Sequence, residues 1–233
     1  MSVENKYHYF ISGSIGVGKT SAINNFMIRY GNNTIKTYFV KEYIDYDCFG
    51  AKKLDEWIKG DIKLLDFQFY IINQFIEQLD TEEYRNAKFI IWERHPMEAL
   101  KVFSTNLPQN EKDTLLNAIN QMCEDFSVPC IDDYIPTHGL KISTYCLTPD
   151  SIADLIYDEM RHNLLRGNFR ATFIFLYVPK PFITEQQERI FKRGRPMETE
   201  RYKRKEELEA INNLYLSFAN KYITGSWVTD IEI

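Results

Sequence analysis

The sequence contains no long apolar run, no closely spaced pair of cysteines and no excess of basic residues. No segment reaches the roughly 18 consecutive apolar residues that a membrane-spanning helix requires, and the first ten residues, MSVENKYHYF, lack the apolar core of a secretion signal. Its four cysteines, at positions 48, 123, 130 and 146, form no C-x-x-C pair, which argues against a zinc site and is typical of a reducing compartment. We therefore expect a soluble, cytoplasmic protein with no membrane partner.

Net charge and chain length further restrict the partners and the number of domains that we expect. Acidic residues outnumber basic ones, 33 to 28, so the net charge is −5 and the basic face that duplex nucleic acid favours is not indicated. The 233 residues show no internal repeat and no low-complexity linker. We expect a single domain over residues 1–233 and no nucleic-acid partner.

Two kinds of apolar segment alternate along the chain. Short runs typical of buried strands lie at 7–12, 37–42, 88–93, 172–178 and the C-terminal end. Helical patterns lie at 19–30, about 62–79, 97–104, 111–125, 150–166, 184–193 and 203–222. This alternation predicts an α/β fold, with a parallel sheet of about five strands and helices on both faces. In such sheets ligands bind beyond the carboxyl ends of the strands.

The first predicted strand runs into a glycine-rich turn. Residues 13–20, GSIGVGKT, match G-x-x-x-x-G-K-[ST] at every fixed position, between a strand and a helix. The amides of such a loop cradle phosphates, its lysine reaches the β- and γ-phosphates, and its hydroxyl binds magnesium. The sequence therefore predicts that ATP and Mg²⁺ bind at Gly13, Ser14, Ile15, Gly16, Val17, Gly18, Lys19 and Thr20.

The next two predicted strands each end in a glutamate. Glu42 follows the second strand, and Glu93 ends the third, just before Arg94. One carboxylate can accept the proton of an attacking hydroxyl and the other can help to hold magnesium, while the arginine neutralises charge on a transferred phosphoryl group. His95, which precedes Pro96, is expected to hydrogen-bond the turn.

The segment 184–207 is basic in an otherwise acidic chain. Gly194 and Pro196 interrupt its helical pattern where Arg193 and Arg195 cluster. A hinged, arginine-bearing lid that covers phosphates is a common part of phosphoryl transfer enzymes, and we place it at about 187–204. A solvated helix with salt bridges is the alternative.

Five motifs in order resemble the deoxynucleoside kinases. They are GSIGVGKT, KEYID, DFQFY, WERHPMEALKVF and KRGRPMETE, spread over about residues 8–222. The ERHP and RGRP motifs are most similar to those of the herpesvirus-type thymidine kinases. The resemblance implies a P-loop kinase fold and ATP-dependent phosphorylation of a deoxynucleoside 5′-hydroxyl, with thymidine leading and deoxycytidine second. It also implies a homodimer built on helix faces, for which 111–125 and 150–166 are candidates.

The resemblance further implies roles for single residues. Glu42 would be the general base with Arg94 beside it, Glu93 and Thr20 would lie at the magnesium ion, and Arg193 and Arg195 would clamp phosphates.

On the acceptor side, Gln68 would read the base edge, Phe103 and Ile71 would enclose the base, and Glu198 would accept a hydrogen bond from the sugar 3′-hydroxyl. Trp57 stands where the family commonly has a tyrosine for that hydroxyl. The family's tryptophan after the catalytic glutamate is missing, so we expect Tyr46 or Phe49 in its place, or a wider pocket.

Three other functional classes are alternatives to a deoxynucleoside kinase. A thymidylate-type nucleoside monophosphate kinase shares the loop and lid but needs cations for the acceptor's phosphate, and residues 43–80 hold four lysines and no arginine. A switch-type GTPase needs N-K-x-D, whereas residues 220–223 read NKYI. A non-catalytic nucleotide-binding module is a further alternative. Turnover with deoxynucleosides separates these classes.

Overall fold

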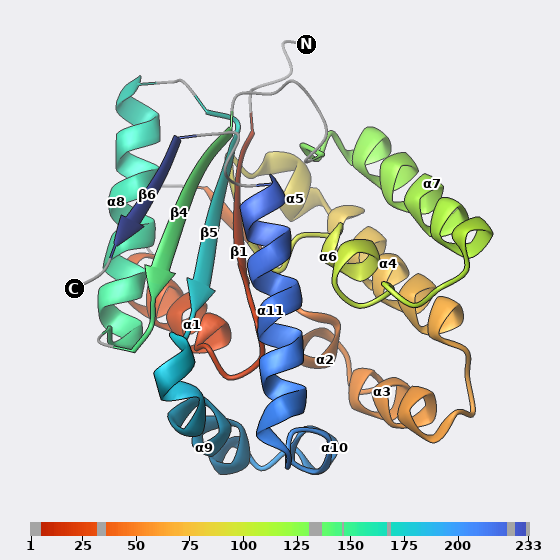
Figure 1. Cartoon of the computed structure of the whole chain (residues 1–233). Coiled ribbons are helices and arrows are strands. Elements are labelled where there is room, and N and C mark those ends of the chain that lie inside the picture. The colour runs from red at the N-terminus through yellow and green to blue at the C-terminus, as the bar shows by residue number, and fades with distance from the viewer. Residues whose placement is uncertain are drawn as a thin grey trace.

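A six-stranded parallel sheet forms the centre of the computed structural model, which describes residues 6–31, 36–130, 137–145, 147–166, 169–222 and 227–231 (Figure 1). In spatial order the strands are β2 (Thr37–Val40), β3 (Phe89–Glu93), β1 (Tyr7–Gly13), β5 (Ala171–Tyr177), β4 (Thr137–Ser143) and β6 (Trp227–Ile231). The predicted α/β class with a parallel sheet is therefore confirmed.

One strand, β4, is not predicted by the sequence, so the sheet has six strands rather than about five. Its residues, THGLKIS, include a glycine and a lysine and do not form the continuous apolar run expected of a buried strand. β4 nevertheless pairs with β5 on one side and β6 on the other.

Helices cover both faces of the sheet, as predicted. Tyr9 and Ile11 of β1 pack in one cluster with residues of α1 (Lys19–Tyr30) and α8 (Pro149–Arg166). Phe10 points the other way, into a cluster with α4 (Leu64–Leu79), α7 (Gln109–Phe126) and α11 (Lys205–Tyr222). The shorter helices are α2 (Tyr43–Tyr46), α3 (Gly50–Lys59), α5 (Glu82–Asn86), α6 (Glu98–Lys101), the 3₁₀ turn η1 (Lys180–Phe182), α9 (Ile183–Arg193) and α10 (Pro196–Arg201).

Within the described ranges, no helix combines the length and the apolarity needed to cross a membrane. The homodimer on helix faces stays a prediction.

The carboxyl ends of the central strands meet at one edge of the sheet. β1 ends in the glycine-rich loop, β2 is followed by Glu42, and β3 ends in Glu93. Helices α9 and α10 lie past the arrowheads of β4 and β5 in Figure 1. The topology therefore brings the loop, both glutamates and the predicted lid to the same edge.

Two buried histidines are expected to make the fold sensitive to acid. Burial lowers the pKa of both His8 and His95 to about 3. Each accepts a hydrogen bond at Nδ1, His8 from the indole of Trp92 at 3.1 Å and His95 from the amide of Met97 at 3.0 Å. His95 thus hydrogen-bonds the turn, as the sequence predicts.

In the unfolded chain both histidines titrate near pH 6.5, so their stabilising effect is complete above that pH and is lost as the pH falls toward 3. We expect the free energy of unfolding to drop by up to about 1.4 kcal/mol per pH unit for each histidine. Urea unfolding between pH 7 and 5 measures this slope. His8→Asn and His95→Asn should each reduce it, whereas His162→Asn, on the exposed side of α8, should not. An unchanged slope in both buried variants would contradict the assignment.

Candidate active site

The glycine-rich loop has the backbone shape that a phosphate site needs. Gly13 and Gly16 have φ values of 141° and 74°, which side chains disfavour. A Cβ on Gly13 would lie 2.3 Å from the carbonyl oxygen of Leu176, so the loop also packs too tightly on β5 for any larger residue. The loop leads directly into the N-terminus of α1, which matches the predicted strand–loop–helix arrangement.

Lys19 is buried against this loop. Its Nζ donates hydrogen bonds to the carbonyl oxygens of Gly13, at 2.9 Å, and Ser14, at 3.0 Å. Burial lowers the pKa of Lys19 to about 8, although nearby carboxylates such as Glu42 partly oppose this. An ammonium held only by neutral carbonyls can turn to bind a phosphate oxygen.

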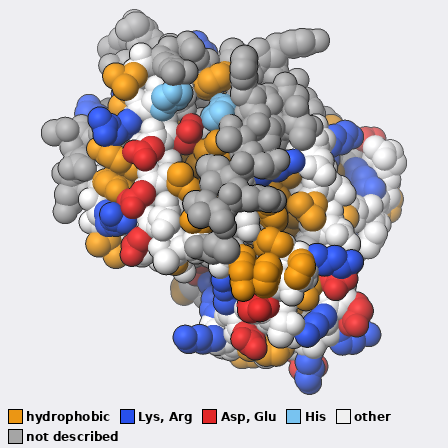
Figure 2. Space-filling view, turned by 60° about the vertical axis from the view of Figure 1, so that its left-hand side comes forward, with side chains coloured by type: hydrophobic (Ala, Val, Ile, Leu, Met, Phe, Trp, Pro, Cys, Tyr) orange, Lys and Arg blue, Asp and Glu red, His pale blue; other side chains and the backbone are white. Residues whose placement is uncertain are grey.

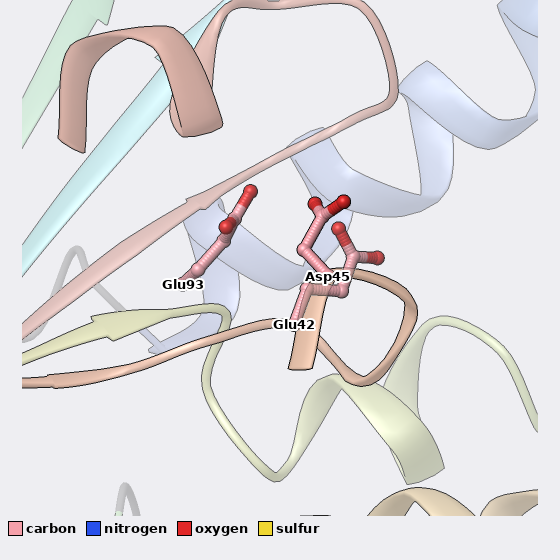
Figure 3. A group of neighbouring side chains, drawn as sticks. All are labelled: Glu42, Asp45 and Glu93. Atoms are coloured by element: carbon pink, nitrogen blue, oxygen red, sulfur yellow. The ribbon is translucent and has the colours of Figure 1, made fainter. Parts of the chain in front are cut away.

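Three carboxylates gather beside the loop. Oxygen atoms of Glu42, Asp45 and Glu93 all lie within 4.8 Å of one another, and Figure 3 shows the three side chains directed to the same side. Thr20 donates its hydroxyl to Glu93 at 2.5 Å, so the two predicted magnesium ligands touch. Burial raises the pKa of Glu93, and the negative charge of Glu42 adds to this shift. A set of carboxylate and hydroxyl oxygens is the donor chemistry that Mg²⁺ prefers.

Arg94 connects Glu42 to a buried network. Its Nε donates to Glu42 at 2.7 Å, and its Nη1 donates to Glu98 at 3.1 Å and to the hydroxyl of Tyr215. That hydroxyl also donates to Glu98 at 2.8 Å. Burial opposes ionisation of Glu42, but the positive charges of Arg94 and Lys19 outweigh it and lower the pKa of Glu42. Glu42 is therefore a carboxylate, able to accept a proton, at neutral pH.

A largely apolar cavity lies beside this network. Its lining includes all five predicted acceptor residues, Trp57, Gln68, Ile71, Phe103 and Glu198. The Gln68 side chain is almost fully buried, and its Oε1 has no hydrogen-bond partner among the described residues. Trp57 stacks on Phe67 with ring centroids 5.2 Å apart and an angle of 4° between the planes. A buried amide oxygen without a partner in such a cavity is suited to a donor group on a ligand.

The wall near Glu42 differs from the expectation. Neither Tyr46 nor Phe49 lines the cavity, and their exposed fractions are 38% and 60%. Tyr43 and Leu54 form this part of the wall instead. Tyr46 ends the short helix α2 and Phe49 immediately precedes α3, and the sequence does not predict that both are exposed there.

The basic segment divides into two functional halves. Arg193 lies 3.3 Å from one oxygen of Glu198, and Arg195 lies 3.2 Å from the other and 2.7 Å from Asp45. Lys203 and Arg204 instead pair with exposed acidic neighbours. Figure 2 shows basic and acidic side chains interspersed over the lower part of the molecule, the level of α9 and α10 in Figure 1. Arg193 and Arg195 therefore face the site, Lys203 and Arg204 lie in the exposed turn between α10 and α11, and the lid stays a prediction.

Replacing Arg195 tests the lid. We expect Arg195→Ala to lower kcat by about 10²-fold, because this side chain would act on transition-state charge more than on the neutral acceptor. Arg193→Ala should lower kcat in the same way. Arg204→Ala, in the solvated half of the segment, is the matched control and should keep kcat. Normal steady-state turnover in both Arg193→Ala and Arg195→Ala would show that the whole segment is a solvated helix.

The two cavities meet at the charged residues. The phosphate-loop cavity contains Lys19, Thr20, Arg193 and Arg195, and it shares Ile15, Glu42, Arg94 and Glu198 with the apolar cavity. A ligand in one cavity would therefore face a ligand in the other across Glu42 and Arg94.

Comparison with known proteins identifies this architecture. No family model matches the chain, and no curated protein matches its sequence. Solved structures of the deoxyadenosine kinase from M. mycoides are similar to it, with bound dATP (TM-score 0.55, 16% identity), with bound dCTP (0.54, 15%) and with the products dCMP and a flexible dCDP (0.51, 17%). Each match covers 97% of this chain and 89% or 90% of the other. The chain has the fold of a deoxynucleoside kinase. Its resemblance to the herpesvirus-type thymidine kinases stays a prediction.

Several residues at the site are not predicted by the sequence. Asp45 follows Glu42 by three residues in a helical turn, a spacing that could have indicated it. Glu98 follows Arg94 by four residues and could have been found in the same way. Tyr215 comes from a distant segment and carries no local signal, whereas Arg201 lies within the predicted lid segment but received no role from the sequence. Arg201 lines the apolar cavity, with its guanidinium 5.2 Å from the Trp57 ring.

Proposed function

We propose that this protein transfers the γ-phosphoryl group of ATP to the 5′-hydroxyl of a deoxynucleoside. The observation that supports this most is the junction of the two cavities. A phosphate loop whose lysine is held only by backbone carbonyls opens on one side of Glu42 and Arg94, and an apolar cavity with an unpaired amide oxygen opens on the other. A phosphate donor and a hydroxyl acceptor bound in these two cavities would meet at this junction.

The chain's own residues divide the work of the reaction. Lys19 and the loop amides hold the β- and γ-phosphates, and Glu42 accepts the proton of the attacking hydroxyl. Arg94, Arg193 and Arg195 neutralise charge on the transferred group. Thr20 and Glu93 would hold Mg²⁺, with Asp45 close enough to assist, and the ion would neutralise negative charge on the phosphates.

Arg195 and Arg193 bind carboxylates in the present structure, and they must turn toward the donor when it arrives. The pairs with Asp45 and Glu198 therefore define the state of the lid before the phosphates bind. A neutral acceptor sugar would replace one partner of Glu198 by its 3′-hydroxyl, with the indole of Trp57 nearby.

We further propose thymidine as the leading acceptor and deoxycytidine as the second. The Gln68 amide has one acceptor and one donor and can match the polar edge of either pyrimidine. Ile71, Phe75, Ala99 and Phe103 give the cavity apolar walls that suit a flat ring and the methyl group of thymine. Structures of this fold hold both dATP and dCTP, so the fold alone does not select the base.

Replacing Gln68 tests base recognition. We expect Gln68→Leu to lower kcat/KM for thymidine by the equivalent of about 1–3 kcal/mol, because the polar edge of the base would be left unpaired. Gln74→Leu, on the same helix and outside the cavity lining, is the control. Thymidine kinetics that are the same in Gln68→Leu and the wild type would refute the assignment.

A phosphorylation assay with ATP and Mg²⁺ tests the function as a whole. The acceptors are thymidine, deoxycytidine, deoxyadenosine, deoxyguanosine, uridine and thymidine monophosphate. We expect the pyrimidine deoxynucleosides to lead. A purine deoxynucleoside as best substrate would overturn the base preference, and no turnover with any acceptor would favour a non-catalytic nucleotide-binding module.

Thymidine monophosphate is included because of Arg201. The four lysines of residues 43–80 argue for a neutral acceptor, but Arg201 reaches the acceptor cavity from the lid and has no ion-pair partner among the described residues. If thymidine monophosphate is phosphorylated faster than thymidine, the monophosphate kinase alternative is favoured.

A further inference from the structure

The phosphate-loop cavity extends well beyond the loop, to residues that the proposed reaction does not use. Besides the loop and the lid, its lining includes Thr144, Leu147, Pro149 and Ile152, which lie between the end of β4 and the first turn of α8. We infer that this wall, residues 144–152 without the undescribed position 146, binds the base of the nucleoside triphosphate donor. The inference rests on the proposed function, because it assumes that the loop holds the donor's phosphates.

The order of the strands fixes the direction in which the donor extends. β5 pairs with β1 on one side, Gly13 opposite Leu176, and with β4 on the other, Ser143 opposite Tyr177. The end of β4 therefore lies two strand spacings, about 10 Å, from the start of the loop. Glu42 and Glu93 follow β2 and β3, on the opposite side of β1. A γ-phosphate that faces Glu42 leaves the sugar and base to run toward β4.

The chemistry of this region suits a flat aromatic ring. Leu147, Pro149 and Ile152 are apolar, whereas Arg189 and Lys192 of α9 also line the cavity. Neither cation has an ion-pair partner within the described residues. A base can pack one face on aliphatic side chains, while a guanidinium lies over its other face.

Hydrogen-bond and ring contacts link the described residues of the wall to neighbouring elements. The Thr144 amide donates to the carbonyl oxygen of Tyr177 at 2.8 Å, and Tyr145 stacks on Phe182, just before α9. Several contacts hold α8 against α1, the helix that starts in the phosphate loop. Asn25 donates to Asp150 at 2.8 Å, and the rings of Tyr30 and Tyr157 stack with centroids 4.0 Å apart. These contacts connect the described residues of the wall to the helix that follows the phosphate loop, and a wall already in position reduces the ordering that donor binding requires.

Calorimetric binding of two ligands to the full chain, each with Mg²⁺, tests the inference. ATP carries a base, and inorganic tripolyphosphate has only the phosphates. Leu147→Trp would fill the space beside the wall, and we expect it to raise the Kd for ATP at least tenfold while the Kd for tripolyphosphate stays within about twofold. Leu165→Trp makes the same change at the far end of α8, where the residue is 83% exposed, and should alter neither Kd.

Leu147→Ala is a milder second variant, whose Kd for ATP should rise about threefold. If thermal melting shows that Leu147→Trp is unfolded, Leu147→Ala takes its place in the test. Equal weakening of both ligands, or unchanged ATP binding in both folded Leu147 variants, would overturn the inference. If the wild type binds neither ligand, the proposed function itself fails, and that result is distinguishable from the other two.

Discussion

Lys19→Ala is expected to abolish turnover, with kcat reduced by about 10³-fold or more. The lysine is the cation that the phosphate loop brings to the β- and γ-phosphates, and its Nζ is held only by carbonyl oxygens in the structure. Steady-state phosphorylation of thymidine, with ATP at the highest attainable concentration, measures the loss.

The fold should survive this substitution, although Lys19 is buried rather than exposed as a loop residue would suggest. Its lowered pKa, about 8, means that burial disfavours the charged form, so removal of the ammonium takes away a destabilising charge. Thermal melting checks this. Lys59→Ala, an exposed lysine of α3 that is paired with Asp55, is the matched control and should be fully active. A folded Lys19→Ala enzyme with near wild-type turnover would mean that the loop is not the donor site.

Glu42→Gln is expected to lower kcat by about 10²–10⁴-fold while the affinity for the nucleoside changes much less. Glutamine keeps the shape of the side chain and can still accept the hydrogen bond from Arg94, which Glu98 and Tyr215 continue to hold. The variant therefore removes the proton acceptor without releasing the arginine. Single-turnover rates and nucleoside binding, measured on the same preparation, separate the two effects.

Two further variants make this result specific. Glu93→Gln should also be slow, but raised magnesium should partly restore it, because Glu93 lies on the metal side with Thr20. Glu124→Gln, on the exposed side of α7, should be normal. An unchanged kcat in Glu42→Gln would show that Glu42 is only a strand-end carboxylate and that another group, or solvent, accepts the proton.

The parts of the site that could be predicted from sequence are those built from neighbouring residues. The phosphate loop is one continuous motif, and Glu42 and Glu93 could be placed because parallel strands bring their carboxyl ends to one edge. The structure places Gln68, Ile71 and Phe103 in the acceptor cavity, as the resemblance implies, and their roles toward a ligand stay predictions.

The parts that could not be predicted depend on contacts between distant segments. Tyr215 reaches Arg94 across 121 positions of sequence, and no local pattern marks it. Strand β4 could not be predicted from its own composition, because it is the pairing with β5 that makes this segment a strand. The argument from the lysines of residues 43–80 did not include Arg201, which reaches the apolar cavity from the predicted lid segment.

The backbone of Arg94 has a consequence for how the protein is made. Its φ of 85° is unusual for a residue with a side chain, and contacts to Glu98 and Tyr215 help to hold it there. Strands β1 to β5 and the phosphate loop all precede residue 178, whereas Tyr215 lies on α11, the last long helix. A chain emerging from the ribosome can therefore complete most of its sheet before this arginine is fixed, and the docking of α11 is the step that completes the proposed catalytic site.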